Sequence, residues 1–240
     1  SSVASRICCA SLVSTVVAPR MPCNRIGCSS LMAHNLAQHL RLMLVTDDQL
    51  LAGRDVVEVA RQAVRGGVTA VQLRLKPAFA RELLSAARAL RAAVSVPILV
   101  NDRPDVAAAA GCGVHLGPED LAVDLARRIL PAASVIGASV GAPVEAVAAA
   151  GADYWGVGPW STTTTKAEAG GALGADGFRR IVALAGGRPC IAIGGVRPED
   201  VPVILAAGGA GVAVVSGILG QADVEAAARR YAALLQGRSA

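Results

Sequence analysis

Aromatic residues are scarce in this chain of 240 residues, which has two Phe, two Tyr and two Trp. Proteins that stack nucleic-acid bases on exposed rings need such residues, so the composition argues against that class. Long apolar runs are also missing. No stretch reaches the roughly 18–20 residues that cross a bilayer, which argues against an integral membrane protein. Hydrophobic residues nevertheless make up 53% of the chain, so it can bury a large core and is not disordered throughout.

Lysine is nearly absent, since only Lys76 and Lys166 occur among the 23 basic residues. The formal net charge is +5, but residues 1–40 hold three arginines and no acid, so the rest of the chain carries an excess of only two positive charges. That excess is too small to form a field that attracts polyanions. In a chain that otherwise uses arginine, the two isolated lysines indicate local roles.

The six cysteines do not form the pattern of a disulfide framework or of a zinc site. Four of them lie in the first 28 residues, while Cys112 and Cys190 stand singly in apolar runs. A chain of this size with a large core does not need disulfides. We therefore expect reduced thiols and a cytoplasmic location.

Residues 1–40 differ from the rest of the sequence, because they contain Ser, Arg and Cys, no acid and no helical or strand period. This composition is typical of an organellar transit peptide, which would place the protein in an organelle, or of an upstream extension without structure. We assign residues 1–40 to an N-terminal extension outside the working enzyme and residues 41–240 to the catalytic domain.

Regular alternation of short apolar strands with helical stretches begins at residue 41. A parallel sheet follows from this order, and eight strand–helix pairs in about 200 residues predict a single compact (β/α)8 TIM barrel of the α/β class. An open doubly wound sheet is the alternative, but no GxGxxG turn opens the first helix. The expected strands are 41–46, 69–76, 97–101, 112–116, 134–139, 152–158, 188–195 and 211–216.

Polar residues gather where these strands end, which is the end of such a barrel that carries the chemistry. Gln72, Arg74 and Lys76 are spaced by two and therefore point the same way. Each residue alone could be a solvated strand end, a helix cap or a packed histidine, but their coincidence at one rim predicts a site. The other members are Asn101, Asp102, His115, Glu119, Asp120, Ser139, Lys166, Gly194, Gly195, Val215, Ser216 and Gly217.

The chemistry that these residues predict is anionic. Glycine-rich turns after the last two strands offer backbone N–H groups to a phosphate. Arg74, Lys76 and Lys166, together with the carboxylates of Asp102 and Asp120, suit one Mg²⁺ ion that carries a diphosphate. The residues alone predict a transferase or lyase that acts on phosphorylated small molecules, with no nucleic-acid or membrane partner.

Seven motifs in order resemble the thiamine-phosphate synthase family, whose barrel is shared by the thiazole tautomerases. They cover nearly all of residues 44–235 and comprise QLRLK (72–76), NDR (101–103), GVHLGPEDL (113–121), GADYWGVGP (151–159), TTTTK (162–166), AIGG (192–195) and VAVVSGI (212–218).

The resemblance implies condensation of hydroxymethylpyrimidine diphosphate with thiazole phosphate, which gives thiamine phosphate and pyrophosphate. It also implies that Asp102 and Asp120 hold one Mg²⁺ ion and that Lys166, Ser139 and Arg74 assist catalysis. The implied pyrimidine-diphosphate contacts are Gln72, Arg74, Lys76, Asn101, Ser139 and Lys166. The implied thiazole-phosphate contacts are Thr163, Thr165, Gly195, Val215 and Ser216.

Three departures from the family pattern matter. Leu75 replaces the usual Glu, and because it faces away from its neighbours we expect an effect on packing rather than on chemistry. The stretch between the two aspartates is one residue short, which makes Glu119 the alternative metal ligand to Asp120. Gly141 stands where a His often follows Ser139, which argues against the tautomerase alternative. A non-catalytic phosphate-binding relative and a homo-oligomer stay open.

Overall fold

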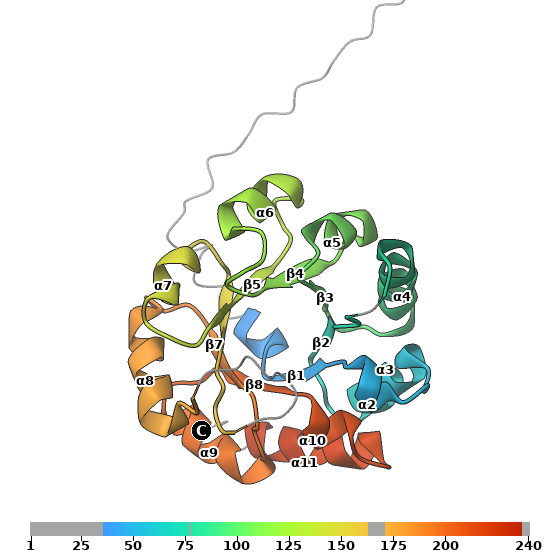
Figure 1. Cartoon of the computed structure of the whole chain (residues 1–240). Helices are drawn as coiled ribbons and strands as arrows, with labels where there is room; N and C mark the ends of the chain where they lie inside the picture. The colour runs from blue at the N-terminus through green and yellow to red at the C-terminus, as the bar shows by residue number, and fades with distance from the viewer. Residues whose placement is uncertain (1–35, 77, 163–170, 237–240) are drawn as a thin grey trace, which may run out of the picture.

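Eight parallel strands close into a barrel in chain order, each paired with its two sequence neighbours, and β1 pairs with β8 (Figure 1). This computed structural model describes residues 36–76, 78–162 and 171–236. The predicted TIM barrel is confirmed, and each observed strand lies within or within one residue of its expected range. The strands are β1 (Leu42–Val45), β2 (Ala70–Leu73), β3 (Ile98–Asn101), β4 (Gly113–Leu116), β5 (Ile136–Val140), β6 (Tyr154–Val157), β7 (Cys190–Ile193) and β8 (Gly211–Val214).

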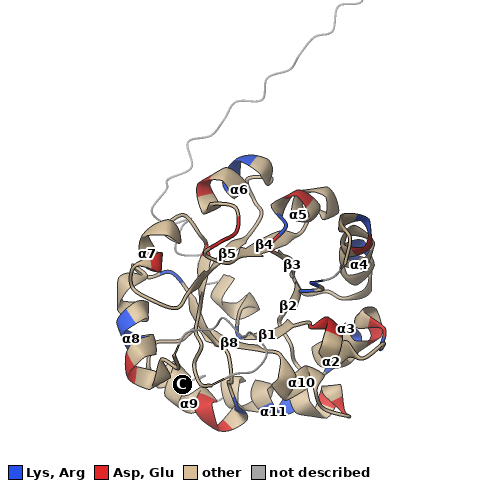
Figure 2. Ribbon diagram, viewed as in Figure 1, with Lys and Arg blue, Asp and Glu red and all other residues tan. Residues whose placement is uncertain are grey.

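Helices surround the barrel, and many Lys, Arg, Asp and Glu residues lie in them (Figure 2). Two one-turn helices, α2 and α10, were not expected from the sequence, because a single turn is too short to show a helical period. The helices are α2 (Asp48–Leu51), α3 (Val56–Arg65), α4 (Ala80–Ala93), α5 (Pro104–Ala110), α6 (Val123–Ile129), α7 (Glu145–Ala148), α8 (Gly174–Leu184), η1 (Pro198–Asp200), α9 (Val201–Ala206), α10 (Ser216–Leu219) and α11 (Val224–Gln236).

Alternation along the strands divides the buried side chains into two sets. On β1, Leu42 and Leu44 pack outward against the helices, while Met43 and Val45 join the cluster inside the barrel. Successive side chains of a strand point to opposite faces, and both faces of this sheet are covered, so its strands are continuously apolar. Polar side chains can enter the interior only near the strand ends, and this directs the chemistry to one rim.

Residues 36–39 form a helical turn that lies across the barrel interior in the view of Figure 1. Leu36 and Leu40 pack against the inner cluster that contains Met43 and Leu99. Packing against the barrel therefore begins five residues before the boundary at residue 41 that the sequence suggested. Residues 1–35 lie outside the described part, so their assignment to an extension stays a prediction.

Two further expectations concern membranes and thiols. No helix among the described residues is long and apolar enough to cross a membrane. Cys112 and Cys190 are buried as free thiols. Burial raises the pKa of both, to about 12 for Cys190. These two thiols are therefore protonated at neutral pH and are poor nucleophiles.

Candidate active site

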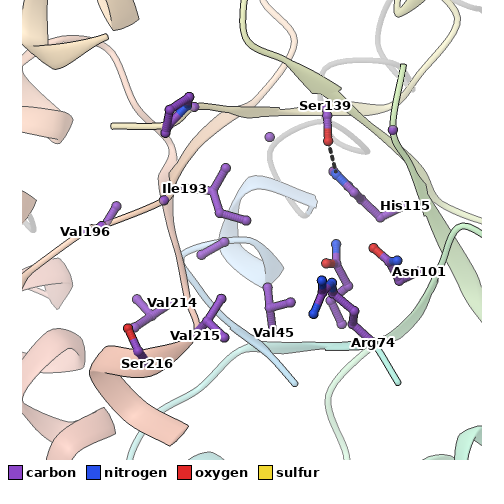
Figure 3. A pocket seen from close by; sticks show the side chains of 18 of the residues that line it. Val45, Arg74, Asn101, His115, Ser139, Ile193, Val196, Val214, Val215 and Ser216 are labelled. Carbon is purple, nitrogen blue, oxygen red and sulfur yellow. Dashed lines mark hydrogen bonds between the residues drawn. The ribbon is translucent and has the colours of Figure 1, made fainter. Parts of the chain in front are cut away.

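A cavity of about 900 Å³ opens at the carboxyl ends of the strands. Figure 3 shows Arg74, Asn101 and His115 on one side of it and Val214 and Val215 on the other. Every predicted site residue within the described part of the chain lines this cavity. They are Gln72, Arg74, Lys76, Asn101, Asp102, His115, Glu119, Asp120, Ser139, Gly194, Gly195, Val215, Ser216 and Gly217. Thr163, Thr165 and Lys166 lie outside the described residues.

Arg74 is fixed by two residues that follow β1. Its guanidinium Nη1 donates to Asp47 Oδ2 at 2.6 Å, and both side chains are largely buried. The Thr46 hydroxyl accepts from the Arg74 backbone N–H at 2.8 Å and donates to the Arg74 carbonyl at 3.0 Å. A guanidinium has five N–H donors, so Arg74 keeps further donors for an anion in the cavity.

Asp47 is a residue that the sequence analysis missed. Its Oδ1 accepts from the N–H groups of Gln49 and Leu50 and so caps α2, while its Oδ2 accepts from the guanidinium of Arg74. The available signal was the TDD turn directly after the first strand, at the same rim as the residues that were selected. An aspartate after a strand is usually interpreted as a cap, and here the same carboxylate performs both roles.

The two predicted metal ligands come from neighbouring strands. Asp102 follows β3 with φ of 64°, a left-handed conformation that few non-glycine residues adopt, and its N–H donates to the His115 carbonyl. Asp120 lies in the turn after β4, where its Oδ2 accepts from the Gly117 N–H at 2.6 Å. Glu119 also lines the cavity but is more exposed than Asp120.

This donor set fits Mg²⁺. The ion is bound in proteins by one or two carboxylates, and water and substrate phosphate oxygens complete its octahedron. Asp102 and Asp120 bring two carboxylates to the lining of the cavity, to which the cationic side chains of Arg74 and Lys76 also belong. No group of three or more potential ligating side chains occurs in the described part of the chain, so a fully protein-built metal site is not present there.

His115 and Ser139 form a hydrogen-bonded pair at the cavity wall. His115 Nε2 lies 3.0 Å from Ser139 Oγ, and His115 Nδ1 lies 2.8 Å from the Tyr154 hydroxyl (Figure 3). The histidine is thus a packed and hydrogen-bonded group, and the sequence did not indicate Tyr154 as its partner.

Glycines make room for these rings. The ring of Tyr154 occupies the space that a side chain at Gly137 would need. A Cβ at Gly156 would lie 3.0 Å from Cε1 of His115. Both glycines face the barrel interior, so their function here is to leave space for a neighbour rather than to form a turn. A sequence without coordinates shows such a glycine only as an interruption of an apolar strand.

Glycine-rich turns line the opposite wall of the cavity. Gly194 and Gly195 have φ of 88° and 68°, and a Cβ at Gly195 would lie 2.8 Å from the Thr162 carbonyl oxygen. Glycine is therefore required at position 195 both by conformation and by space. After β8, Ser216 begins α10, and the first N–H groups of a helix have no acceptor within that helix. These groups suit a phosphate.

Two of the departures from the family pattern have structural explanations. Leu75 packs against the outer core between strands and helices, as expected for a residue that faces away from the site. At position 141, a Cβ would lie 2.8 Å from the Gly158 carbonyl oxygen, so a histidine would not fit this backbone. The Gly141 N–H instead donates to Glu145 Oε2 at 2.6 Å, and Glu145 also lines the cavity.

Comparison with known proteins agrees with this geometry. The family model described as thiamine monophosphate synthase matches residues 42–218, which include all eight strands. The chain belongs to the thiamine monophosphate synthase family.

Individual members of the family match over nearly their whole length. The thiamine-phosphate synthase of Azorhizobium caulinodans is 44% identical, over 82% of this chain and 95% of that protein. The enzyme of Xanthobacter autotrophicus is 46% identical, over 83% and 97%. Thiamine phosphate pyrophosphorylase from Pyrococcus furiosus superposes with a TM-score of 0.75 at 36% identity, over 84% of this chain and 98% of that one. The expected resemblance to this synthase family is confirmed.

Proposed function

We propose that this protein is a thiamine-phosphate synthase, a transferase that joins hydroxymethylpyrimidine diphosphate to thiazole phosphate. The observation that supports it best is the division of one cavity into two walls. Arg74, Lys76, Asp102 and Asp120 form a wall suited to a diphosphate with its cation, and the glycine-rich turns near Gly195 form a wall suited to a monophosphate. Family membership supplies the identity of the two substrates.

The reaction needs positioning more than it needs a nucleophilic side chain. The bond between the pyrimidine methylene carbon and the diphosphate oxygen breaks, and pyrophosphate leaves with the electron pair. The thiazole nitrogen gives its lone pair to that carbon, and the product is a thiazolium. Two ligands held on facing walls of one cavity meet at an effective concentration that solution cannot provide. The leaving group builds up negative charge, which a fixed cation stabilises.

The side chains divide these tasks. Arg74 is held by Asp47 in one orientation, so it offers its remaining N–H groups to the diphosphate without reorganising. Asp102 and Asp120 would hold Mg²⁺, which when bound neutralises charge on the departing pyrophosphate. Gln72, Asn101 and Ser139 line the same cavity and are proposed as the contacts of the pyrimidine. Lys76 and Lys166 are proposed as further diphosphate contacts, and Lys166 as a catalytic cation.

The remaining wall would hold the second substrate. Gly195, Val215 and Ser216 are proposed to bind the phosphate of the thiazole through backbone N–H groups, together with Thr163 and Thr165. Backbone N–H groups can bind a phosphate whatever side chains the residues carry. Such binding suits the thiazole substrate, which must be held but does not react at its phosphate. The tautomerase alternative is disfavoured, because Gly141 cannot supply the histidine of that pattern.

One assay tests the proposal. The protein is incubated with both substrates and Mg²⁺, and thiamine phosphate is detected after oxidation to its fluorescent form. Product that depends on both substrates is expected. Isomerisation of the thiazole substrate without condensation would favour the tautomerase, and binding of both ligands without product would favour a non-catalytic relative.

A further inference from the structure

The described residues that line the cavity from β6 onward include one charged side chain, that of Arg197. It lies two residues after Gly195, in the segment between β7 and η1. Its neighbour Val196 lies on the same side of the cavity as Val215 and Ser216 (Figure 3). Arg197 therefore adds a positive charge to the second wall, whose other described lining groups are uncharged.

Arg197 occupies the N-cap position of the helical segment formed by η1 and α9, where an arginine is unfavourable in two respects. Its backbone is extended, with φ of −109° and ψ of 162°, and Pro198 takes the first helical position, as at an ordinary helix start. An N-cap side chain normally accepts from a free N–H of the first turn, and a guanidinium has no acceptor. A cation is also disfavoured beside the positive end of a helix.

Asp200 supplies part of the missing cap through the backbone of Arg197. The Asp200 Oδ2 accepts from the Arg197 N–H at 2.8 Å, and the Asp200 N–H donates to the Arg197 carbonyl at 3.0 Å. The arginine side chain does not contribute to this cap. Within the described part of the chain the guanidinium forms no hydrogen bond or ion pair, and the residue is exposed at the rim. Its N–H donors therefore remain for a ligand.

Tyr231 of α11 connects the backbone that carries Arg197 to the end of β8. Its hydroxyl is buried and donates to the Val196 carbonyl at 3.0 Å. A Cβ at Gly217 would overlap with the same hydroxyl, so the phenol packs against the turn that holds Ser216. The segments after β7 and β8 are thus held together behind the second wall.

A residue that is unfavourable for its local structure and lines a binding cavity indicates a functional requirement. We propose that Arg197 is a binding residue whose guanidinium contacts the phosphate of the thiazole substrate. This inference rests on the proposed function, which assigns that substrate to the second wall. A phosphate group carries roughly 1.5–2 negative charges at pH 7. Neutral N–H groups do not balance this charge, whereas a guanidinium can pair with two phosphate oxygens at once.

The first experiment measures binding of each substrate alone and needs no turnover. The Kd for thiazole phosphate is measured by calorimetry at low and high salt for the wild type, Arg197→Gln and Arg180→Gln. Arg180 is the matched control, because it is an exposed arginine of α8 that does not line the cavity. Arg197→Gln should raise the Kd at low salt about tenfold, or 1.4 kcal/mol, and reduce its salt dependence. Arg180→Gln should change neither quantity.

Binding of the pyrimidine diphosphate with Mg²⁺ completes this experiment. Its Kd should be the same in all three proteins, because it binds the first wall. Equal weakening of both ligands in Arg197→Gln would indicate a general electrostatic effect, and an unchanged Kd for thiazole phosphate would remove Arg197 from the site. Either result overturns the proposal and leaves the synthase assignment to the product assay. A wild type that binds no thiazole phosphate would overturn both.

The second experiment separates a binding role from a structural one. Arg197→Ser supplies the missing cap oxygen, so we expect the melting temperature without ligand to rise by about 2–4 °C. The Kd for thiazole phosphate should nevertheless rise about tenfold, as in Arg197→Gln. A residue with a structural role would lose stability and affinity together. A melting temperature below that of the wild type would therefore overturn the proposal, as would a thiazole-phosphate Kd that does not change.

Discussion

The two walls of the cavity differ in the residue types that line them. Strands β1 to β5 contribute side chains that carry charge or hydrogen-bonding groups, held by one another, as Asp47 holds Arg74 and His115 holds Ser139. The part of the chain from β6 onward contributes mainly glycines and apolar residues, and its polar lining residues are Thr162, Arg197, Ser216, Gln221 and Tyr231. The first wall can stabilise the charge that develops on the leaving diphosphate, whereas the second can hold a phosphate whose charge does not change in the reaction. The difference predicts that substitutions in the first wall reduce turnover and those in the second weaken binding.

The largest effect is expected at the proposed metal site. Asp102→Ala should lower turnover by ~100-fold or more and raise the Mg²⁺ requirement, because the cation stabilises charge that develops on the leaving diphosphate. Affinity for the thiazole phosphate should change by less than about tenfold, since it binds the other wall. An Mg²⁺ titration of the rate and calorimetry with thiazole phosphate measure the two quantities.

Asp120→Ala and Glu119→Ala complete that experiment. Asp120 is held by the Gly117 N–H and is less exposed than Glu119, so we expect a severe defect for Asp120 and a mild one for Glu119. The reverse order would make Glu119 the second ligand. Full activity of the wild type in EDTA would contradict the metal assignment altogether.

The next effect concerns the support of Arg74. Asp47→Asn keeps an oxygen that can cap α2 but removes the charge that pairs with Arg74. We expect the KM for the pyrimidine diphosphate to rise by about tenfold or more, because the guanidinium loses its charge-assisted partner and its fixed orientation. The thiazole phosphate KM should stay nearly constant. Steady-state kinetics with each substrate varied in turn distinguishes the two.

Asp55→Asn is the matched control. Asp55 caps α3 through the N–H groups of Val57 and Glu58 on the outer surface, as Asp47 caps α2. Loss of such a cap costs about 0.5–2 kcal/mol of stability, and asparagine is an equally good cap. Equal kinetic changes in Asp47→Asn and Asp55→Asn would mean that the Asp47 effect is a general loss of stability.

The contrast between the walls also explains what the sequence could predict. The fold follows from local periodicity, since eight apolar runs alternate with helical stretches, and each run becomes a strand. The rim residues follow from their position at strand ends. Gln72 and Arg74 are correctly placed by an alternation of two, even though β2 itself ends at Leu73. Both the strands and the rim residues can be predicted because the patterns that indicate them extend over only a few neighbouring residues.

The supporting contacts are not local and therefore escaped prediction. Asp47 meets Arg74 only because β1 and β2 pair in a register that aligns Val45 with Gln72. Tyr154 meets His115 across 39 residues, and Gly137 and Gly156 leave space for the two rings. Registers and steric allowances of this kind depend on the closed barrel, so the sequence pattern identifies the residues of the site but not what holds them.

A smaller effect is expected in the second wall. Gly195→Ala places a Cβ 2.8 Å from the Thr162 carbonyl at a φ of 68°, so the turn after β7 must move. We expect the KM for thiazole phosphate to rise about tenfold while the pyrimidine diphosphate KM changes little. Gly186→Ala is the control, because Gly186 has φ of 59° but open space around it. Both variants should lose about 1–2 kcal/mol of stability from the left-handed conformation, and an equal thiazole phosphate KM in both would refute a binding role for this turn.

The smallest effect on activity is expected behind the second wall, at Cys190. This side chain of β7 packs into the outer core, away from the cavity, so Cys190→Ala should leave both KM values unchanged.

The same substitution should change stability at alkaline pH. Burial raises the pKa of the thiol from 9.0 to about 12. The unfolded chain therefore ionises near pH 9 while the folded protein keeps its proton. The contribution of this thiol to stability is fully present below pH 9 and is lost progressively as pH rises from 9 to 12. Urea unfolding of wild type and Cys190→Ala under reducing conditions should give curves of stability against pH that converge above pH 9, because only the wild type carries this loss. Parallel curves across that range would show that Cys190 is accessible to solvent in the folded protein.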